Sequence, residues 1–366
     1  MTAQPLRVLV VDDSAYNRKN IADILAGRDD VEVVGKAGDG DEALRLASQL
    51  RPDCITLDLE MPRMDGFTFL RILMARQPTP VIVVSSYSNK ENVFKALELG
   101  AIDFVAKPDR QFSPDGPIRK EILGKVLLVR HLRPLTPAPA RPTPLSSARA
   151  SIPEIAPAPA PPVVPARAVA LRYLVGIASS TGGPSALLEL FGRIPDRFPG
   201  AFFIAQHMPD KFTKTFAERL DRKGNLRVVE ASDGDLVTSR AAYVCPGKMC
   251  MELFAMPGSA GPGALGDVRV RVAQPAATDR FIPSGDRLLK SVAQIAGARS
   301  IGVILTGMGD DGVQGARAIR GVGGVVVAES EETAVVYGMP GAAARAGVVS
   351  DQLPLHAIPD WFNQFT

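Results

Sequence analysis

Cysteine is scarce in this 366-residue chain, and this scarcity bears on the cellular compartment in which the protein works. The three cysteines, Cys54, Cys245 and Cys250, cannot all pair with one another, and no CxxC pair of the zinc-binding kind occurs. This usage fits a reducing compartment. The N-terminus lacks the charged-then-apolar layout of a signal peptide, and no apolar run approaches the roughly 20 residues needed to cross a bilayer. We therefore expect a soluble, cytoplasmic protein with no direct membrane insertion.

Charge of one sign and histidine are also in short supply. The formal net charge is only +3 and long basic tracts are absent, so nothing favours a nucleic-acid partner. There are three histidines, which leaves few candidates for a general base near neutral pH. Hydrophobic residues make up 46% of the chain, enough for large buried cores, and the length predicts two domains.

Glycine is missing from residues 131–170, a segment that holds 11 of the 31 prolines. Proline removes backbone donors and fixes φ, so this segment cannot form a helix or a central strand. Polyproline II stretches would make it a semi-rigid spacer. The composition predicts a first domain at 1–130, a Pro/Ala-rich linker at 131–170 and a second domain at 171–366.

Short apolar runs rich in valine and isoleucine alternate with helical periodicity on both sides of this linker. The first side has LRVLVVDD, DCITLDLEMP, TPVIVVSS and DFVAKPD, and the second has RYLVGIASS, AFFIAQHMP, RSIGVILTGMGDDG and GGVVVAES. Near-continuous apolar strands are typical of parallel sheets covered on both faces. We expect an α/β fold with two doubly wound parallel sheets, in which ligands bind at the carboxyl ends of the strands.

Polar residues follow the apolar runs of the first domain. Asp12 and Asp13 follow the first run, Asp58 follows a later one, and Lys107 ends the last. Three carboxylates held close together repel one another unless a hard cation such as Mg²⁺ lies among them. A metal-bound carboxylate beside a lysine can attack a phosphoryl donor, whereas a single strand-end aspartate is more often a helix cap. The Lys107-Pro108 bond is a candidate cis peptide that turns the chain into this site.

The motifs DD, LDLEMPRMDG, VVSS and FVAKP, in that order, resemble a response-regulator receiver domain over residues 1 to about 125. The resemblance implies a flavodoxin-like fold and phosphorylation that requires Mg²⁺. It assigns the phosphoacceptor to Asp58, Mg²⁺ binding to Asp12, Asp13, Asp58 and the backbone carbonyl of Glu60, phosphoryl contact to Lys107, and the hydroxyl and aromatic switch positions to Ser85 and Phe104.

The stretch GIASSTGGP in the second domain could cradle a phosphate or could present a nucleophilic serine. A cradle would show GxGxxG and an acidic residue closing the second strand, and neither is present. His207 is the only histidine at the end of an apolar run, and LTGMGDDG offers Asp310 and Asp311. A serine, a histidine and an aspartate at three strand ends form a candidate catalytic triad. Spacing alone does not choose Ser180 over Ser179, nor Asp311 over Asp310.

The motifs STGGP, QHMP, YVCPGKM, LTGMGDDG and VVYGMPGAA together resemble the catalytic domain of CheB-type protein-glutamate methylesterases. The resemblance implies a Rossmann-like fold with Ser180 as nucleophile, His207 as base and Asp311 as the residue that orients the base. It also places Thr181 and Met308 beside the nucleophile, where their backbone amides would serve as oxyanion donors. It implies no cofactor for the hydrolase.

Two places depart from the family pattern. Ala178 and Ser179 replace a Gly-Ala step before the nucleophile, and the run RFIPSGDRLLKSV carries Gly285 and Asp286. In addition, the segment MPGSAGPGALGD at 256–267 looks like a flexible insertion of unknown role. The insertion and the run could alter substrate contacts.

The two resemblances together imply a phosphorylation-regulated serine hydrolase of chemotaxis and two-component signalling. Its substrates would be γ-glutamyl methyl esters on methylated chemoreceptors, which release methanol, and receptor glutamines, which it deamidates. A cognate CheA-type histidine kinase would be the phosphodonor. We expect the receiver to pack over the triad, and phosphorylation of Asp58 to shift this packing toward an open form. The alternative is a response regulator whose output domain binds a nucleotide or a partner without chemistry.

Overall fold

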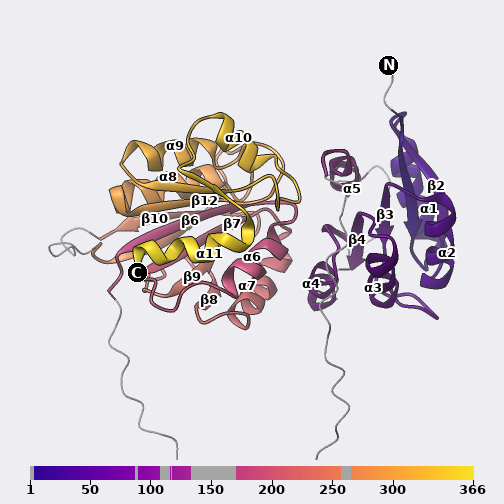
Figure 1. Cartoon of the computed structure of the whole chain (residues 1–366), viewed down its shortest axis with the longest axis horizontal. Coiled ribbons are helices and arrows are strands. Elements are labelled where there is room, and N and C mark those ends of the chain that lie inside the picture. Colours follow the sequence, from indigo (N-terminus) through magenta and orange to yellow (C-terminus); the bar gives the residue numbers. More distant parts are fainter. Residues whose placement is uncertain (1–3, 87–89, 108–115, 117, 133–169, 257–264) are drawn as a thin grey trace, which may run out of the picture.

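In this computed structural model the chain folds into two units, each built on a parallel β-sheet with helices on both faces (Figure 1). The structure describes residues 4–86, 90–107, 116, 118–132, 170–256 and 265–366. The expected pair of parallel-sheet α/β units is confirmed. Most of the proline-rich linker, residues 257–264 of the glycine-rich segment and Pro108 of the candidate cis bond lie outside the described residues.

The first sheet has five parallel strands in the order β2-β1-β3-β4-β5. Its strands are β1 Leu6–Val11, β2 Val31–Ala37, β3 Cys54–Leu57, β4 Val81–Ser86 and β5 Asp103–Lys107. Its helices are α1 Ala15–Ala26, α2 Gly40–Leu50, α3 Gly66–Arg76, α4 Lys90–Glu98 and α5 Ile118–Leu128, followed by the 3-10 turn η2 Val129–His131. Buried apolar side chains pack on both faces of this sheet.

Polar side chains begin the first three helices of this unit. Ser14, Asp39 and Asp65 each accept a hydrogen bond from a backbone amide in the first turn of α1, α2 and α3. Such caps satisfy amides that have no partner inside the helix. They fix where the loops after β1, β2 and β3 end, and two of these loops carry the aspartates of the candidate phosphorylation site.

The second sheet has seven parallel strands in the order β14-β13-β12-β6-β7-β9-β8. Its strands are β6 Tyr173–Ser179, β7 Gly200–Gln206, β8 Arg227–Glu230, β9 Ala241–Val244, β12 Ser300–Ile304, β13 Val325–Glu329 and β14 Asp351–Leu353. A separate antiparallel pair, β10 Cys250–Ala255 and β11 Val268–Ala273, was not among the expected elements.

Six helices cover the two faces of the second sheet, with α6, α7 and α11 on one face and α8, α9 and α10 on the other (Figure 1). The helices are α6 Gly183–Phe191, α7 Thr213–Asp221, α8 Gly285–Ala296, α9 Val313–Gly321, α10 Met339–Arg345 and α11 Ile358–Trp361. The 3-10 turns are η3 Asp210–Phe212, η4 Gly297–Arg299, η5 Leu355–Ala357 and η6 Phe362–Phe365. Among the described residues, no helix combines the length and apolar character that crossing a bilayer requires.

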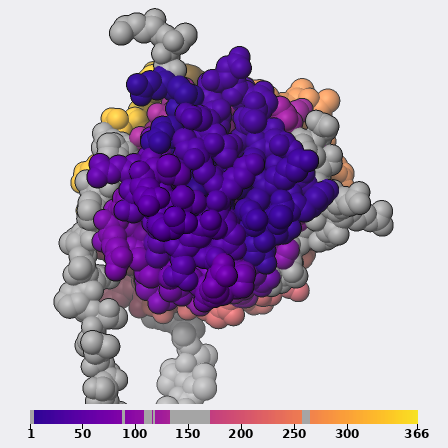
Figure 2. Space-filling model, turned by 90° about the vertical axis from the view of Figure 1, so that its right-hand side faces the viewer, coloured from indigo at the N-terminus to yellow at the C-terminus, as the bar shows by residue number. Residues whose placement is uncertain are grey.

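The two units pack against each other, with α4 of the first beside α6 and α7 of the second (Figure 1). Phe94 stacks on Phe216 with ring centroids 5.4 Å apart, and Phe104 meets Phe212 at 4.6 Å. Each such aromatic pair contributes about 1 kcal/mol beyond the burial of its surface. Figure 2 shows the first unit from its outer side, where it hides most of the second.

Charged side chains border this aromatic contact. Arg219 of α7 lies 3.0 Å from Glu91 and 2.7 Å from Glu98, both on α4, and Arg222 pairs with Glu91 as well. The Arg219 side chain is largely buried, whereas that of Arg222 is exposed. An ion-pair network with a shielded guanidinium stabilises an interface more than an isolated surface pair does.

Candidate active site and phosphorylation site

Three neighbouring strands at the centre of the second sheet bring the candidate triad together. In the order β12-β6-β7, Ser180 directly follows β6, His207 directly follows β7, and Asp311 lies in the loop after β12. Because parallel strands end at the same edge, these three loops share one side of the sheet. The backbone ties two of them together, since the His207 amide donates to the Ser179 carbonyl at 3.0 Å.

Ser179 and Ser180, which spacing alone could not separate, occupy different environments. Ser179 is fully buried at the end of β6, and its hydroxyl donates to Oε1 of Gln206 at 2.6 Å. Ser180 lines a cavity of about 460 Å³ together with His207. Only Ser180 is therefore open to a substrate. Within the described part of the chain its hydroxyl makes no hydrogen bond to His207, and this bond must form before proton transfer, as is common before substrate binds.

His207 is oriented by a carboxylate and by an aromatic ring. Its Nε2 lies 2.8 Å from Oδ2 of Asp311, and its ring stacks on Phe281 with centroids 5.4 Å apart and planes only 7° from parallel. The Asp311 carboxylate accepts the Nε2 proton, which leaves Nδ1 as the basic nitrogen. Phe281 was not predicted from the sequence, because stacking between distant loops leaves no local pattern.

Asp311 is held by the N-terminus of α8. Its carboxylate is 1% exposed and accepts hydrogen bonds from the amides of Gly285, at 2.7 Å, and Asp286, at 2.9 Å. The positive end of the helix favours a negative charge at this position. The neighbouring Asp310 is instead exposed and pairs with Arg280 at 3.1 Å. Burial and partners thus single out Asp311 as the aspartate that contacts His207.

Gly285 lies directly against Ala178 and Asp311. A Cβ atom at Gly285 would lie 2.7 Å from Cβ of Ala178 and 3.1 Å from Oδ2 of Asp311. Real side chains do not approach at 2.7 Å, so the methyl group of Ala178 fits only because residue 285 lacks one.

Backbone amides beside Ser180 are available to a substrate oxyanion. Within the described residues, the amides of Thr181 and Met308 donate to no protein acceptor, although the Met308 side chain itself is 51% exposed. Gln206 holds the turn in place, because its Nε2 donates to the carbonyls of Ser180 at 2.9 Å and His207 at 3.0 Å. Sequence reasoning missed Gln206, although its place in QHMP, directly before the candidate base, was a usable signal.

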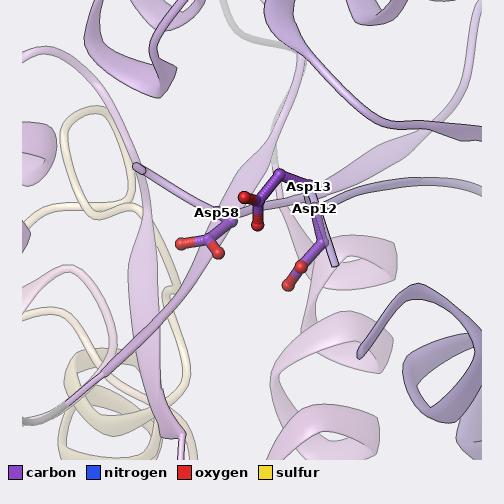
Figure 3. Close-up of side chains that lie close together, drawn as sticks. All are labelled: Asp12, Asp13 and Asp58. Carbon is purple, nitrogen blue, oxygen red and sulfur yellow. The ribbon is translucent and has the colours of Figure 1, made fainter. Parts of the chain in front are cut away.

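The carboxylates of the first unit gather at the ends of β1 and β3 (Figure 3). Asp12, Asp13 and Asp58 each offer an oxygen, and these oxygens lie within 4.8 Å of one another. Oxygen ligands at this spacing are those that Mg²⁺ prefers, so the residues fit the ion. Burial raises the pKa of Asp12 above its ordinary value, and the Asp58 charge adds to this while Lys107 opposes it.

Lys107 reaches into this cluster from the end of β5. Its Nζ lies 2.8 Å from Oδ2 of Asp12 and also bonds Asp58. Burial alone would lower the pKa of Lys107, but the charges of Asp58 and Asp12 outweigh it and the pKa is raised. Lysine therefore stays charged at the point where a phosphoryl group would carry negative charge.

The other three positions assigned by the resemblance to a receiver domain lie in β4, in β5 and just after β3. Ser85 is buried in β4, beside Ala106 of β5. Phe104 is buried in β5 and faces Phe212 of the second unit. The Glu60 amide approaches Asp58 Oδ1 at 3.5 Å, which places residue 60 next to the carboxylate cluster.

Two family models match the chain. One, the response regulator receiver domain, matches residues 8–112, and the other, the CheB methylesterase, matches residues 175–362. The chain belongs to the CheB methylesterase family. Two relatives support this membership. The "Protein-glutamate methylesterase/protein-glutamine glutaminase 6" of Anaeromyxobacter dehalogenans is 48% identical over 96% of this chain and 93% of its own. The "Protein-glutamate methylesterase/protein-glutamine glutaminase 1" of Myxococcus xanthus is 45% identical over 96% of this chain and 94% of its own.

A solved structure is also similar to the second unit. The catalytic domain of the Thermotoga maritima CheB methylesterase is 36% identical and covers 53% of this chain and 98% of its own, with a TM-score of 0.49.

In this CheB family member the receiver contacts the residue beside the candidate nucleophile. The hydroxyl of Thr181 donates to Oδ2 of Asp103 at 2.6 Å, across the interface between the units. Asp103 is in turn paired with Lys125 of α5 at 2.8 Å, and both line the cavity that contains Ser180 and His207. The receiver thus forms one wall of the cavity that contains Ser180 and His207. Asp103 had no local motif to mark it.

Proposed function

We propose that this chain is a phosphorylation-regulated protein-glutamate methylesterase and protein-glutamine glutaminase that acts on chemoreceptors. The observation that carries the proposal is the pairing of His207 with Asp311 in the same cavity as Ser180. A base with an orienting carboxylate next to an accessible hydroxyl is the arrangement that acyl transfer requires. Membership of the CheB methylesterase family supplies the class of substrate. The alternative of a non-catalytic output domain finds no support.

The first half of the reaction forms an ester with the protein. Ser180 Oγ attacks the carbonyl carbon of the γ-glutamyl methyl ester while Nδ1 of His207 takes its proton. The carbonyl oxygen becomes an oxyanion next to the amides of Thr181 and Met308, and each such donor is worth roughly 3 kcal/mol in the transition state. The C–O bond to the methoxy group then breaks, and the imidazolium returns its proton to release methanol.

The second half restores the serine. Water attacks the acyl carbon as Nδ1 of His207 accepts one of its protons, and collapse of the intermediate returns that proton to Ser180 Oγ. The product is a receptor glutamate. Deamidation of a glutamine side chain follows the same steps, with ammonia as the leaving group in place of methanol. Asp311 remains ionised throughout and stabilises the imidazolium that forms at each step.

Regulation would start at Asp58, with a cognate CheA-type histidine kinase as phosphodonor. Asp12, Asp13, Asp58 and the Glu60 carbonyl would hold Mg²⁺, which when bound neutralises the charge of the transferred phosphoryl group. Lys107 contacts that group. Ser85 and Phe104 would carry the change from Asp58 toward the interface, where Phe104 already packs on Phe212. Loosening this packing would open the cavity.

The decisive experiment measures methanol release from membranes that contain methylated receptors. Ser180→Ala is expected to lower kcat at least about 1,000-fold, as loss of a triad nucleophile does. Asp311→Asn should also be severely impaired, whereas Asp310→Asn, the matched control on the exposed neighbour, should remain within about twofold. Full activity of Ser180→Ala would refute the proposal.

A further inference from the structure

A second buried carboxylate lies behind the catalytic loops and is not part of the triad. Glu329 ends β13, the neighbour of β12, and is 1% exposed. Its Oε2 accepts the amide proton of Thr306 at 2.9 Å, and its Oε1 accepts the hydroxyl proton of Thr333 at 3.0 Å. Among the described residues no lysine, arginine or histidine forms an ion pair with it. Burial raises the pKa of Glu329 to about 7, against the two hydrogen bonds and with a small contribution from Glu189.

An ionised carboxylate in this place does not stabilise the fold. Taking a charge out of water without a cationic partner is unfavourable, and a raised pKa is the direct sign of that cost. A glutamine or an apolar side chain would avoid it. The position of Glu329 therefore calls for an explanation other than packing.

Thr306, the residue that Glu329 holds, connects to the backbone of the nucleophile through two hydrogen bonds. Its carbonyl accepts the Ser180 amide proton at 3.0 Å, and its hydroxyl donates to the Thr181 carbonyl at 2.9 Å. The same hydroxyl accepts the Val336 amide proton at 2.9 Å. Thr306 thus binds the amide of Ser180 and the carbonyl of Thr181, the two backbone groups on either side of the Ser180–Thr181 peptide.

The next residue adds a steric constraint on the same serine. A Cβ atom at Gly307 would lie 2.7 Å from Cβ of Ser180, so the two loops are in close contact at this point. A small movement of the Thr306–Gly307 backbone would therefore shift Ser180 and also the Met308 amide that follows. Displacements well below 1 Å at a reacting group are enough to slow catalysis.

We propose that Glu329 is a positioning residue for Ser180: its carboxylate holds the Thr306 amide from behind, and Thr306 in turn holds the backbone of Ser180 and Thr181. The inference rests on the proposed function, because the hydroxyl that it positions is the proposed nucleophile. Glu329 touches neither substrate nor the reacting atoms, and its effect is exerted entirely through Thr306.

Three full-length variants test this role. Glu329→Leu removes the acceptor for Thr306, Glu329→Gln keeps an oxygen that can accept the same proton, and Val326→Ala, a buried site on the same strand, is the control for lost stability. For each we would measure kcat and KM for methanol release, the rate at which a fluorophosphonate reagent labels Ser180, and the urea midpoint. The labelling rate reports on the nucleophile without any receptor.

The expected pattern separates positioning from stability. Glu329→Leu should lower kcat and the labelling rate at least about tenfold with KM within twofold, and Glu329→Gln should restore both to within about threefold of wild type. Val326→Ala should lower the urea midpoint and leave kcat unchanged. Wild-type rates for Glu329→Leu, or an equal loss in Val326→Ala, would overturn the inference.

Two further outcomes keep the test decisive. If Glu329→Leu does not fold, Thr306→Val, which removes the hydroxyl links to Thr181 and Val336 and keeps the backbone of residue 306, should still lower kcat and the labelling rate, and unchanged rates would overturn the inference. Absence of methanol release and of Ser180 labelling in the wild-type protein would instead refute the proposed function. The two failures are therefore distinguishable.

Discussion

Adding one methyl group at residue 285 should disturb the orientation of the catalytic base. In Gly285→Ala the new Cβ would lie 2.7 Å from Cβ of Ala178, closer than real Cβ atoms come, and 3.1 Å from Oδ2 of Asp311, tighter than most real contacts. Either α8 or the end of β6 must move by several tenths of an ångström. Overpacking of this kind typically lowers the free energy of unfolding by about 1–3 kcal/mol.

The same movement should reduce activity. The Gly285 and Asp286 amides hold the Asp311 carboxylate, so a shift of α8 pulls on the residue that orients His207. Since a 1 Å misplacement costs roughly 100-fold in rate, we expect a shift of this size to lower kcat by about tenfold. Methanol release from methylated receptor membranes measures this loss, and urea unfolding measures the loss of stability.

A second substitution supplies the control. Ala178→Gly removes the methyl group that the new Cβ would meet, and alone it should cost about 1 kcal/mol, as glycine does in a strand. In the double variant the two effects should not add, with an interaction energy of about 1–2 kcal/mol. Additivity within about 0.5 kcal/mol, or a Gly285→Ala enzyme with wild-type kcat, would refute the reasoning.

Three further predictions concern the buried glutamate and the interface. Burial raises the pKa of Glu329 to about 7 from its ordinary 4.5, so the stability that its protonated form contributes is present below pH 4.5 and lost as pH rises through 7. Glu329→Gln should therefore be up to about 3 kcal/mol more stable than wild type at pH 8 and gain nothing at pH 4, by urea unfolding. Arg219→Ala, which breaks the ion pairs with both Glu91 and Glu98 of α4, should raise the unphosphorylated labelling rate of Ser180 roughly fivefold or more, whereas Arg222→Ala, which breaks an exposed single pair, should change it less than twofold. Asp103→Ala should raise the unphosphorylated rate of methanol release and leave the rate after phosphorylation unchanged, and a lower rate in both states would contradict a role in closing the cavity.

The central strands could be predicted from the sequence because they are buried on both faces. β1, β3, β4, β6, β7 and β12 read as continuous apolar runs. β2 was missed because it lies at the edge of its sheet, and in VEVVGKA only the first and last residues are buried, with charged residues next to both. β14 was missed because it has only three residues, two of them exposed. Edge strands lack the run of apolar residues that marks a core strand.

Some residues of the candidate site could be predicted from the sequence in the same way, and others could not. Ser180, His207 and Asp311 could be proposed because each follows an apolar run, and parallel strands bring their ends together. Their catalytic roles stay predictions. The amides of α8 that hold Asp311 and the receiver residue Asp103 could not be foreseen, because a backbone donor and a partner 78 residues away have no local pattern.

The hydrogen bond between Thr181 and Asp103 has a thermodynamic consequence for signalling. Under the proposed function the receptor side chain must enter the cavity that Asp103 lines, so a bound receptor would favour the separated arrangement of the two units. Thermodynamic linkage is reciprocal. If phosphorylation of Asp58 raises the affinity for the receptor by some factor, a bound receptor must raise the equilibrium constant for phosphorylation of Asp58 by the same factor. A heavily methylated receptor array would thus help to hold its own demethylating enzyme in the phosphorylated state.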